Sequence, residues 1–145
     1  IPKDKKVKED IYIQDAMATT LELAGIEKPE YVFFNSVLDL ATGKQTKGNY
    51  DAIYNGYIDL QRMIRKDGYK LIVYPKIEKV LLYDLNNDPE EMHDLSEDDA
   101  YKTKVNDMFK DLIKLQIVIF FPLLKRAITI KPVIALFYNW LVFFL

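Results

Sequence analysis

The 145-residue sequence contains no cysteine and only one histidine. Without cysteine the chain has no disulfide framework, no thiolate nucleophile and no cysteine-based metal site. The histidine, His93, follows an acidic turn, and one histidine alone supplies neither a nucleophile–base pair nor a multi-ligand metal site. We interpret His93 as a solvated or capping side chain. The composition therefore predicts no catalytic residues and no metal ligands in this chain.

Basic residues are not in excess. The net charge is −2, and because residues 117–145 hold three basic residues and no acidic one, the first 116 residues carry a net charge of −5. A nucleic-acid-binding surface needs a basic stripe that meets the phosphates. The charge balance therefore argues against nucleic acid as a partner.

The sequence also lacks an apolar run long enough to span a membrane, which takes about 20 residues. Residues 117–124 and 133–145 are apolar, but Lys125, Arg126 and Lys131 interrupt them. We interpret residues 117–145 as an apolar tail whose abrupt onset is more typical of a frameshift than of an anchor. Membrane association through this tail is the alternative.

The first 49 residues predict a connecting segment that includes one short helix. Asp15 is the expected N-cap, and Met17, Leu21 and Ala24 then fall on one helical face. Gly25 stands where a left-handed residue ends a helix. A polar loop with two glycines, residues 41–49, closes this segment.

Residues 50–116 predict a compact α+β unit. β-branched and aromatic residues are concentrated in four runs, and the Asp67-Gly68 pair between two of them is a strong hairpin signal. Within the second run, Gln61, Met63 and Arg65 are expected to face one way and Arg62 and Ile64 the other. Connections this short require antiparallel pairing. The expected strands cover residues 52–58, 61–65, 69–74 and 80–85.

An amphipathic helix is expected to follow this sheet. Ser96, Asp98 and Asp99 offer N-caps, and the apolar positions after them recur at intervals of three and four. That stripe needs a partner, and the sheet is the candidate. The expected fold is a small four-stranded antiparallel sheet covered by a C-terminal amphipathic helix, with a short N-terminal lead-in helix. The stripe consists of Tyr101, Val105, Met108, Phe109, Leu112 and Gln116.

Three motifs in residues 10–116 carry a family resemblance. Residues 14–29 end in Leu-Ala-Gly-Ile-x-x-Pro, and residues 61–72 contain Arg-x-x-Arg-x-x-x-Tyr-Lys-Leu-Ile. Residues 82–95 read Leu-Tyr-Asp-Leu-x-x-Asp-Pro-Glu-Glu-x-x-Asp-Leu. In this order and spacing they resemble the C-terminal part of bacterial sulfatases, the formylglycine-dependent members of the alkaline-phosphatase-like superfamily. Two places depart from the family pattern. Ala18 stands where the family usually has proline, and the sequence after Gln116 does not resemble the family.

The resemblance implies sulfate-ester hydrolysis by a larger enzyme. In that family a formylglycine made from a Cys/Ser-x-Pro/Ala-x-Arg motif attacks sulfur, and calcium polarises the sulfate. The formylglycine and the calcium site belong to an N-terminal catalytic domain in that family. This chain has no Cys/Ser-x-Pro/Ala-x-Arg motif. We therefore expect a C-terminal fragment, inactive alone, whose intact parent binds calcium and a sulfated glycan or aryl ester. A parent of this kind would be periplasmic or secreted.

By the same resemblance, the fragment would form a wall of the substrate cleft. Tyr57, Asp59, Gln61 and Arg62 cluster around a turn, and the arginine fork suits sulfate because it donates two hydrogen bonds at once. The simpler interpretation pairs Arg62 with Asp59 or Asp67. Two other functions stay open: a stand-alone interaction or membrane-associated module, and part of a related phosphohydrolase.

Overall fold

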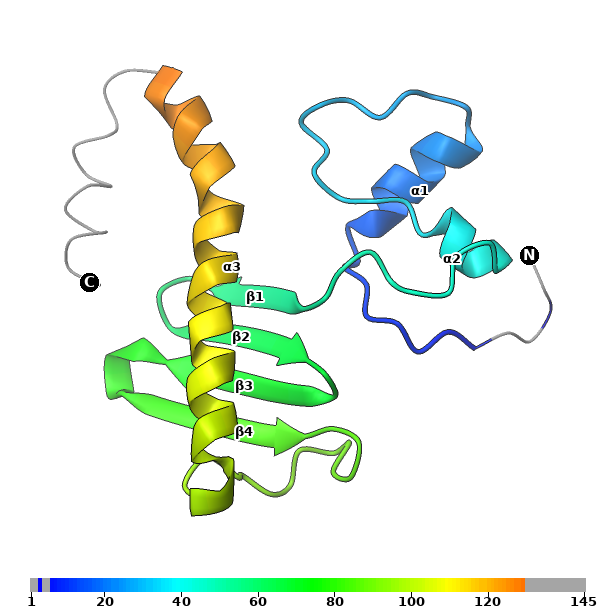
Figure 1. The fold of residues 1–145 in the computed structure, drawn as a ribbon. Helices are drawn as coiled ribbons and strands as arrows, with labels where there is room; N and C mark the ends of the chain where they lie inside the picture. The colour runs from blue at the N-terminus through cyan, green and yellow to red at the C-terminus, as the bar shows by residue number, and fades with distance from the viewer. Residues whose placement is uncertain (1–2, 4–5, 130–145) are drawn as a thin grey trace.

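The computed structural model describes residue 3 and residues 6–129, with side chains up to residue 118. Its four strands are adjacent in the order of the sequence and all pair antiparallel. The helix α3 crosses one face of this sheet, and α1 and α2 lie beyond one end of it (Figure 1). The predicted α+β architecture is confirmed. The elements are α1 (Asp15–Leu23), α2 (Leu38–Thr42), β1 (Ile53–Tyr57), β2 (Gln61–Lys66), β3 (Tyr69–Tyr74), η1 (Pro75–Ile77), β4 (Lys79–Asp84), η2 (Asp99–Tyr101) and α3 (Lys102–Thr129).

The core lies between the sheet and α3. One residue of each strand belongs to a row that crosses the sheet on the helix side, and Met108 and Leu112 of α3 pack on this row. Burying each such side chain contributes roughly 1.5–3 kcal/mol before entropy. The predicted alternation of β2 is confirmed, since Arg62 and Ile64 are buried while Gln61, Met63 and Arg65 are not. The row is Tyr54, Ile64, Leu71 and Leu82.

The helix α3 continues to Thr129, past the change of composition at Gln116. Phe109, expected in the buried stripe, is 40% exposed and therefore lies at its edge. Within residues 3 and 6–129, no helix is both long and apolar enough to cross a membrane. The rest of the predicted apolar tail, residues 130–145, lies outside the described residues.

The turn between β2 and β3 has the predicted form. Asp67 and Gly68 both have positive φ, 51° and 77°, as a type I′ hairpin turn requires. A Cβ added at Gly68 would lie only 2.1 Å from Nδ2 of Asn86. Glycine is therefore favoured here by its backbone conformation, and a Cβ would also displace the exposed side chain of Asn86.

Replacing Gly68 with alanine is expected to lower the free energy of unfolding by roughly 2 kcal/mol, because the positive φ costs an L-residue about 1 kcal/mol and Asn86 must also move. The matched control is Gly25→Ala, where φ is +66° but nothing lies within 4 Å of the new Cβ. We expect it to cost about half as much. Urea unfolding followed by circular dichroism measures both, and equal losses would exclude the contact with Asn86 as a cause.

The helix α1 differs from its prediction at its start and on its buried face. Gln14, not Asp15, is the N-cap, and Asp15 is the first helical residue with a fully buried side chain. Met17, expected on the packed face, is 56% exposed, and Ala18 is buried instead. The end is as predicted, because Gly25 has φ +66° and the amide of Ile26 donates to the carbonyl of Leu21 at 2.9 Å.

The second helix was not predicted. The five residues of α2 overlap the start of the polar loop expected over residues 41–49. Leu40 is buried at 5% exposure, and Gly43 ends the helix with φ 85°. A helix this short has a costly nucleus and few propensity signals, so its packing stabilises it.

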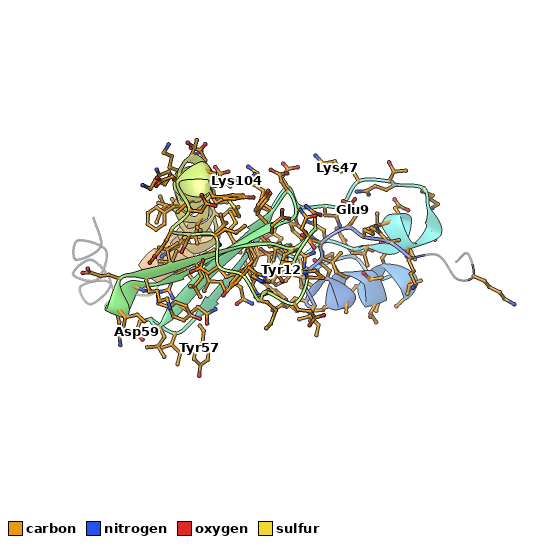
Figure 2. The ribbon with its side chains drawn as sticks, turned by 90° about the horizontal axis from the view of Figure 1, so that it is seen from below. Glu9, Tyr12, Lys47, Tyr57, Asp59 and Lys104 are labelled. Carbon is orange, nitrogen blue, oxygen red and sulfur yellow. The ribbon has the colours of Figure 1, made fainter. Side chains whose placement is uncertain are left out.

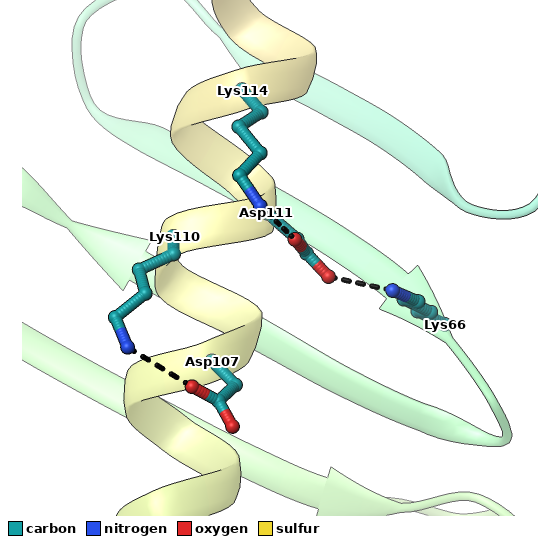
Figure 3. A network of polar contacts seen from close by, with 5 residues as sticks. All are labelled: Lys66, Asp107, Lys110, Asp111 and Lys114. Atoms are coloured by element: carbon teal, nitrogen blue, oxygen red, sulfur yellow. Dashed lines mark hydrogen bonds and ion pairs between the residues drawn. The ribbon is translucent and has the colours of Figure 1, made fainter.

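Charged residues on the exposed side of α3 form ion pairs with the helix itself and with the sheet. Asp111 contacts Lys66 of β2 at 2.6 Å and Lys114 at 3.1 Å, and Asp107 contacts Lys110 at 3.1 Å (Figure 3). Lys66, followed by Lys114, holds the pKa of Asp111 below its usual range. The Asp111 contact therefore ties the helix to the C-terminal end of β2 at neutral pH.

Replacing Asp111 with asparagine is expected to lower the free energy of unfolding by about 0.5–1 kcal/mol at neutral pH. Because the folded pKa lies below the unfolded value of about 3.9, this stabilisation is present above about pH 4 and is lost as the pH falls through the folded pKa. Asp107→Asn, at an exposed pair, is the control and should change little. Urea unfolding at neutral and acidic pH measures both, and a loss independent of pH would contradict the ion-pair origin.

Candidate functional site

The four candidate residues lie around the turn between β1 and β2, at the end of the sheet opposite α1 and α2 (Figure 1). Tyr57, the last residue of β1, is 62% exposed and is the cross-strand partner of Gln61, the first residue of β2. Figure 2 shows Tyr57 and Asp59 extending from the side of the sheet that α3 does not cover. The structure thus brings Tyr57 and Gln61 side by side, with Asp59 in the turn between them.

Asp59 joins this turn to the next connection on the same end of the sheet. Its carboxylate contacts Nζ of Lys76, in η1, at 2.6 Å. That hydrogen bond, above all, keeps the pKa of Asp59 below its usual range. Each charge is therefore neutralised by the other where the two connections meet.

Arg62 faces the opposite way. It is only 7% exposed, and Nη1 of its guanidinium donates to the carbonyls of Ile58 and Gln61, both at 2.8 Å. Burial raises the pKa of Tyr54 and the nearby charge of Arg62 partly offsets that rise. Within the described residues Arg62 forms no ion pair with Asp59 or Asp67, the simpler pairing considered from the sequence. Its hydrogen bonds hold the turn from inside.

Two further features of this end of the sheet are not predictable from the sequence pattern. Ile58 has φ 50°, in the left-handed region that a β-branched residue rarely adopts, and its side chain is 71% exposed. Ile77 of η1 is 68% exposed and Leu60 43%. The turn therefore presents an apolar surface next to its polar side chains. The one signal in the sequence for this strained backbone is the presence of a β-branched residue, Ile58, in a turn.

The rest of the described structure offers no competing chemistry. His93 is exposed, and its Nδ1 lies 3.7 Å from Asp88, which accepts hydrogen bonds from the amides of Met92 and His93. In the described part of the chain, no three His, Cys, Asp or Glu side chains are placed to hold a metal ion. The arrangement can bind and orient a ligand, but it contains no nucleophile–base pair.

Comparison with known proteins identifies the family. Residues 1–118 match the model of the C-terminal domain of N-sulphoglucosamine sulphohydrolase. Two curated relatives each align with 70% of this chain: an ulvan-active sulfatase from Formosa agariphila at 31% identity and an uncharacterised protein from Haemophilus influenzae at 32%. The chain spans 28% and 54% of their lengths, respectively.

Solved structures show the same fold. A 2-O GAG sulfatase is 26% identical, with a TM-score of 0.57 over 69% of this chain and 23% of its own. A second structure, in complex with its substrate D-glucosamine-2-N,6-O-disulfate, has 24% identity and a TM-score of 0.62 over 70% of this chain and 23% of its own. The match covers most of the chain and includes all three motifs noted in the sequence. The chain belongs to the N-sulphoglucosamine sulphohydrolase C-terminal family, the C-terminal domain of the alkaline-phosphatase-like sulfatases.

Proposed function

We propose that this chain is the C-terminal domain of a sulfuric ester hydrolase and that its β1–β2 turn forms one wall of the substrate cleft. Tyr57, Asp59 and Gln61 line the wall, and Arg62 supports it from behind the turn. The observation that carries the proposal is the placement of Tyr57, 62% exposed, beside Gln61 on the face that α3 leaves uncovered. An aromatic ring next to an amide and a carboxylate is a chemistry that recognises sugar rings and hydroxyls.

In this proposal the reacting groups belong to another part of the enzyme. The sequence lacks a Cys/Ser-x-Pro/Ala-x-Arg motif that could become formylglycine. A calcium ion in the intact enzyme would polarise the sulfate there, and this chain would position the rest of the substrate. A sulfated glycan is the favoured substrate class, because one relative is active on ulvan and another is a GAG sulfatase.

The test has two parts. The purified chain is first incubated with D-glucosamine-2-N,6-O-disulfate and calcium, and we expect no release of sulfate. The same compound is then titrated into the isotope-labelled chain while amide resonances are recorded by NMR. We expect shifts confined to residues 57–62 and the adjacent residues 75–78. Sulfate release, or shifts only at another surface, would contradict the proposal.

A further inference from the structure

Each strand contributes one residue to a second row, which crosses the sheet on the face that α3 leaves uncovered. Each of these residues lies three positions from the buried core residue of its strand. Because side chains alternate along a strand, this odd offset places them on the opposite face. Figure 2 shows Tyr57 extending to that side, and the register of the sheet sets the four residues next to one another in strand order. This uncovered row is Tyr57, Gln61, Tyr74 and Lys79.

The uncovered row is wider than a single sugar ring. Neighbouring strands lie about 4.8 Å apart, so three spacings separate the backbones of Tyr57 and Lys79 by about 14 Å. Tyr57, 62% exposed, offers an aromatic ring at one end, and the exposed Lys79 offers a charge at the other. Gln61 and Tyr74, half-buried between them, offer an amide and a hydroxyl. A sugar ring that meets Tyr57 therefore leaves Lys79 accessible to another ring of the same glycan.

The other cations of this face are held by carboxylates. Arg65 contacts Asp10 at 3.0 Å, and Lys70 contacts Glu91 at 2.7 Å. Within the described part of the chain Lys79 forms no ion pair. Its ammonium is therefore the charge of this face that can meet an anionic ligand without breaking a contact in the protein.

The cations of the two connections at this end of the sheet are engaged as well. Lys76 contacts Asp59 at 2.6 Å, so the two charges offset each other. The guanidinium of Arg62 donates to two carbonyl oxygens behind the turn. Neither cation is placed to bind a second anionic group of a glycan, and Lys79 is.

Two carboxylates lie near Lys79 without pairing with it. Glu78 precedes it, at the end of η1, and has no ion pair among the described residues. Asp94 accepts hydrogen bonds from the amides of Leu82 and Ser96, at 3.0 and 2.9 Å. Burial raises the pKa of Asp94, but these hydrogen bonds, with a smaller effect from the charge of Lys79, lower it. The Asp94 carboxylate is thus already bound, and Glu78 is the acid whose charge opposes an anion at Lys79.

We propose that Lys79 binds a sulfate group on a ring next to the one that meets Tyr57, so that the uncovered row holds an oligosaccharide across the four strands. The inference rests on the proposed function and specifies that the sulfated glycan is recognised over more than one ring. An ammonium is a compact charge with three donors that rotate to suit the oxygens of a sulfate. Gln61 and Tyr74 would hydrogen-bond hydroxyls between the two rings. Lys79 binds the substrate away from the reacting groups.

The test titrates two sugars into the isotope-labelled chain and follows amide and lysine side-chain signals by NMR. One is the single ring D-glucosamine-2-N,6-O-disulfate, and the other is N-acetylchitotriose sulfated at O6 of each ring, in which sulfate is the only anion. We expect both to shift residues 57–62 and 75–78, and only the trisaccharide to shift the Cε–Hε signals of Lys79. If the trisaccharide leaves these signals unchanged, this inference is overturned and the proposed function stands. No shift at this end of the sheet by either sugar would overturn both.

Lys79→Gln removes the charge and keeps a polar side chain. We expect it to weaken binding of the trisaccharide about fivefold and to change binding of the single ring by less than about twofold. The control Lys44→Gln removes an equal charge from an exposed lysine beyond the opposite end of the sheet and should change neither. Glu78→Gln should tighten binding of the trisaccharide, because it removes the opposing charge. Equal losses for the two sugars, equal effects of Lys79→Gln and Lys44→Gln, or weaker binding by Glu78→Gln would overturn the assignment of Lys79.

Discussion

Replacing Asp15 with alanine is expected to lower the free energy of unfolding by about 3–5 kcal/mol. The side chain is completely buried, and its carboxylate accepts hydrogen bonds from the amides of Tyr12 and Asn35 at 2.9 and 3.1 Å and from the hydroxyl of Tyr50. Alanine removes this acceptor from all three donors, of which only the amide of Asn35 has a second one, the hydroxyl of Tyr50 at 3.3 Å. Each buried donor left unsatisfied costs about 1–3 kcal/mol. Because water partly reaches these donors, we expect the loss of stability to lie near the lower end of the summed cost.

The carboxylate of Asp15 matters because it joins segments that are distant in the sequence. Tyr50 lies 35 residues away, and its pKa is raised to about 12 by burial and by its hydrogen bond to Asp15. Tyr12 continues the connection, because its hydroxyl accepts from the amide of Tyr54 in β1 at 2.7 Å. Loss of the carboxylate should therefore loosen the N-terminal segment from the sheet.

Denaturant unfolding followed by circular dichroism measures the loss at Asp15, and hydrogen exchange locates it. We expect faster exchange at the amides of Tyr12 and Asn35, with little change in the core strands. The control is Asp51→Ala, since Asp51 is 81% exposed in a surface pair with Lys47 and its removal should change stability by less than about 0.5 kcal/mol. A similar small effect at Asp15 would show that water replaces the carboxylate.

The features predicted correctly from the sequence are those with local causes. Asp67-Gly68 selects its turn because both residues tolerate positive φ, and Gly25 ends α1 for the same reason. The period of α3 and the alternation of β2 follow from which residues must be buried. The sequence predicts a turn around Tyr57, Asp59 and Gln61 but not its register, which pairs Tyr57 with Gln61.

The features that could not be predicted depend on long-range contacts. Asp15 looked like an ordinary cap, and its burial depends on Asn35 and Tyr50, 20 and 35 residues away. Arg62 was expected either to contact an anion or to pair with Asp59 or Asp67, because the sequence does not show that a turn would direct two carbonyls at its guanidinium. The strain at Ile58 is equally invisible, since it is imposed by the turn that Arg62 holds.

The attachment of α3 to the sheet depends on a few side chains, and Leu112 contributes most directly. It is 1% exposed and packs in the cluster with Ile64, Leu71 and Leu82. Leu112→Ala removes the buried side chain and leaves a cavity between two rigid layers, which close only partly around it. We therefore expect a loss of about 2–5 kcal/mol in the free energy of unfolding.

Ile113, the next residue, provides a matched control, since it is 41% exposed on the same helix. Alanine is the best helix former and favours α3 slightly in both variants, so propensity cannot explain a loss at Leu112. Ile113→Ala should change stability by less than about 1 kcal/mol. Urea unfolding followed by circular dichroism measures both variants. If they lose the same stability, the helix does not cover the sheet through this face, and the apolar period of α3 must serve another contact.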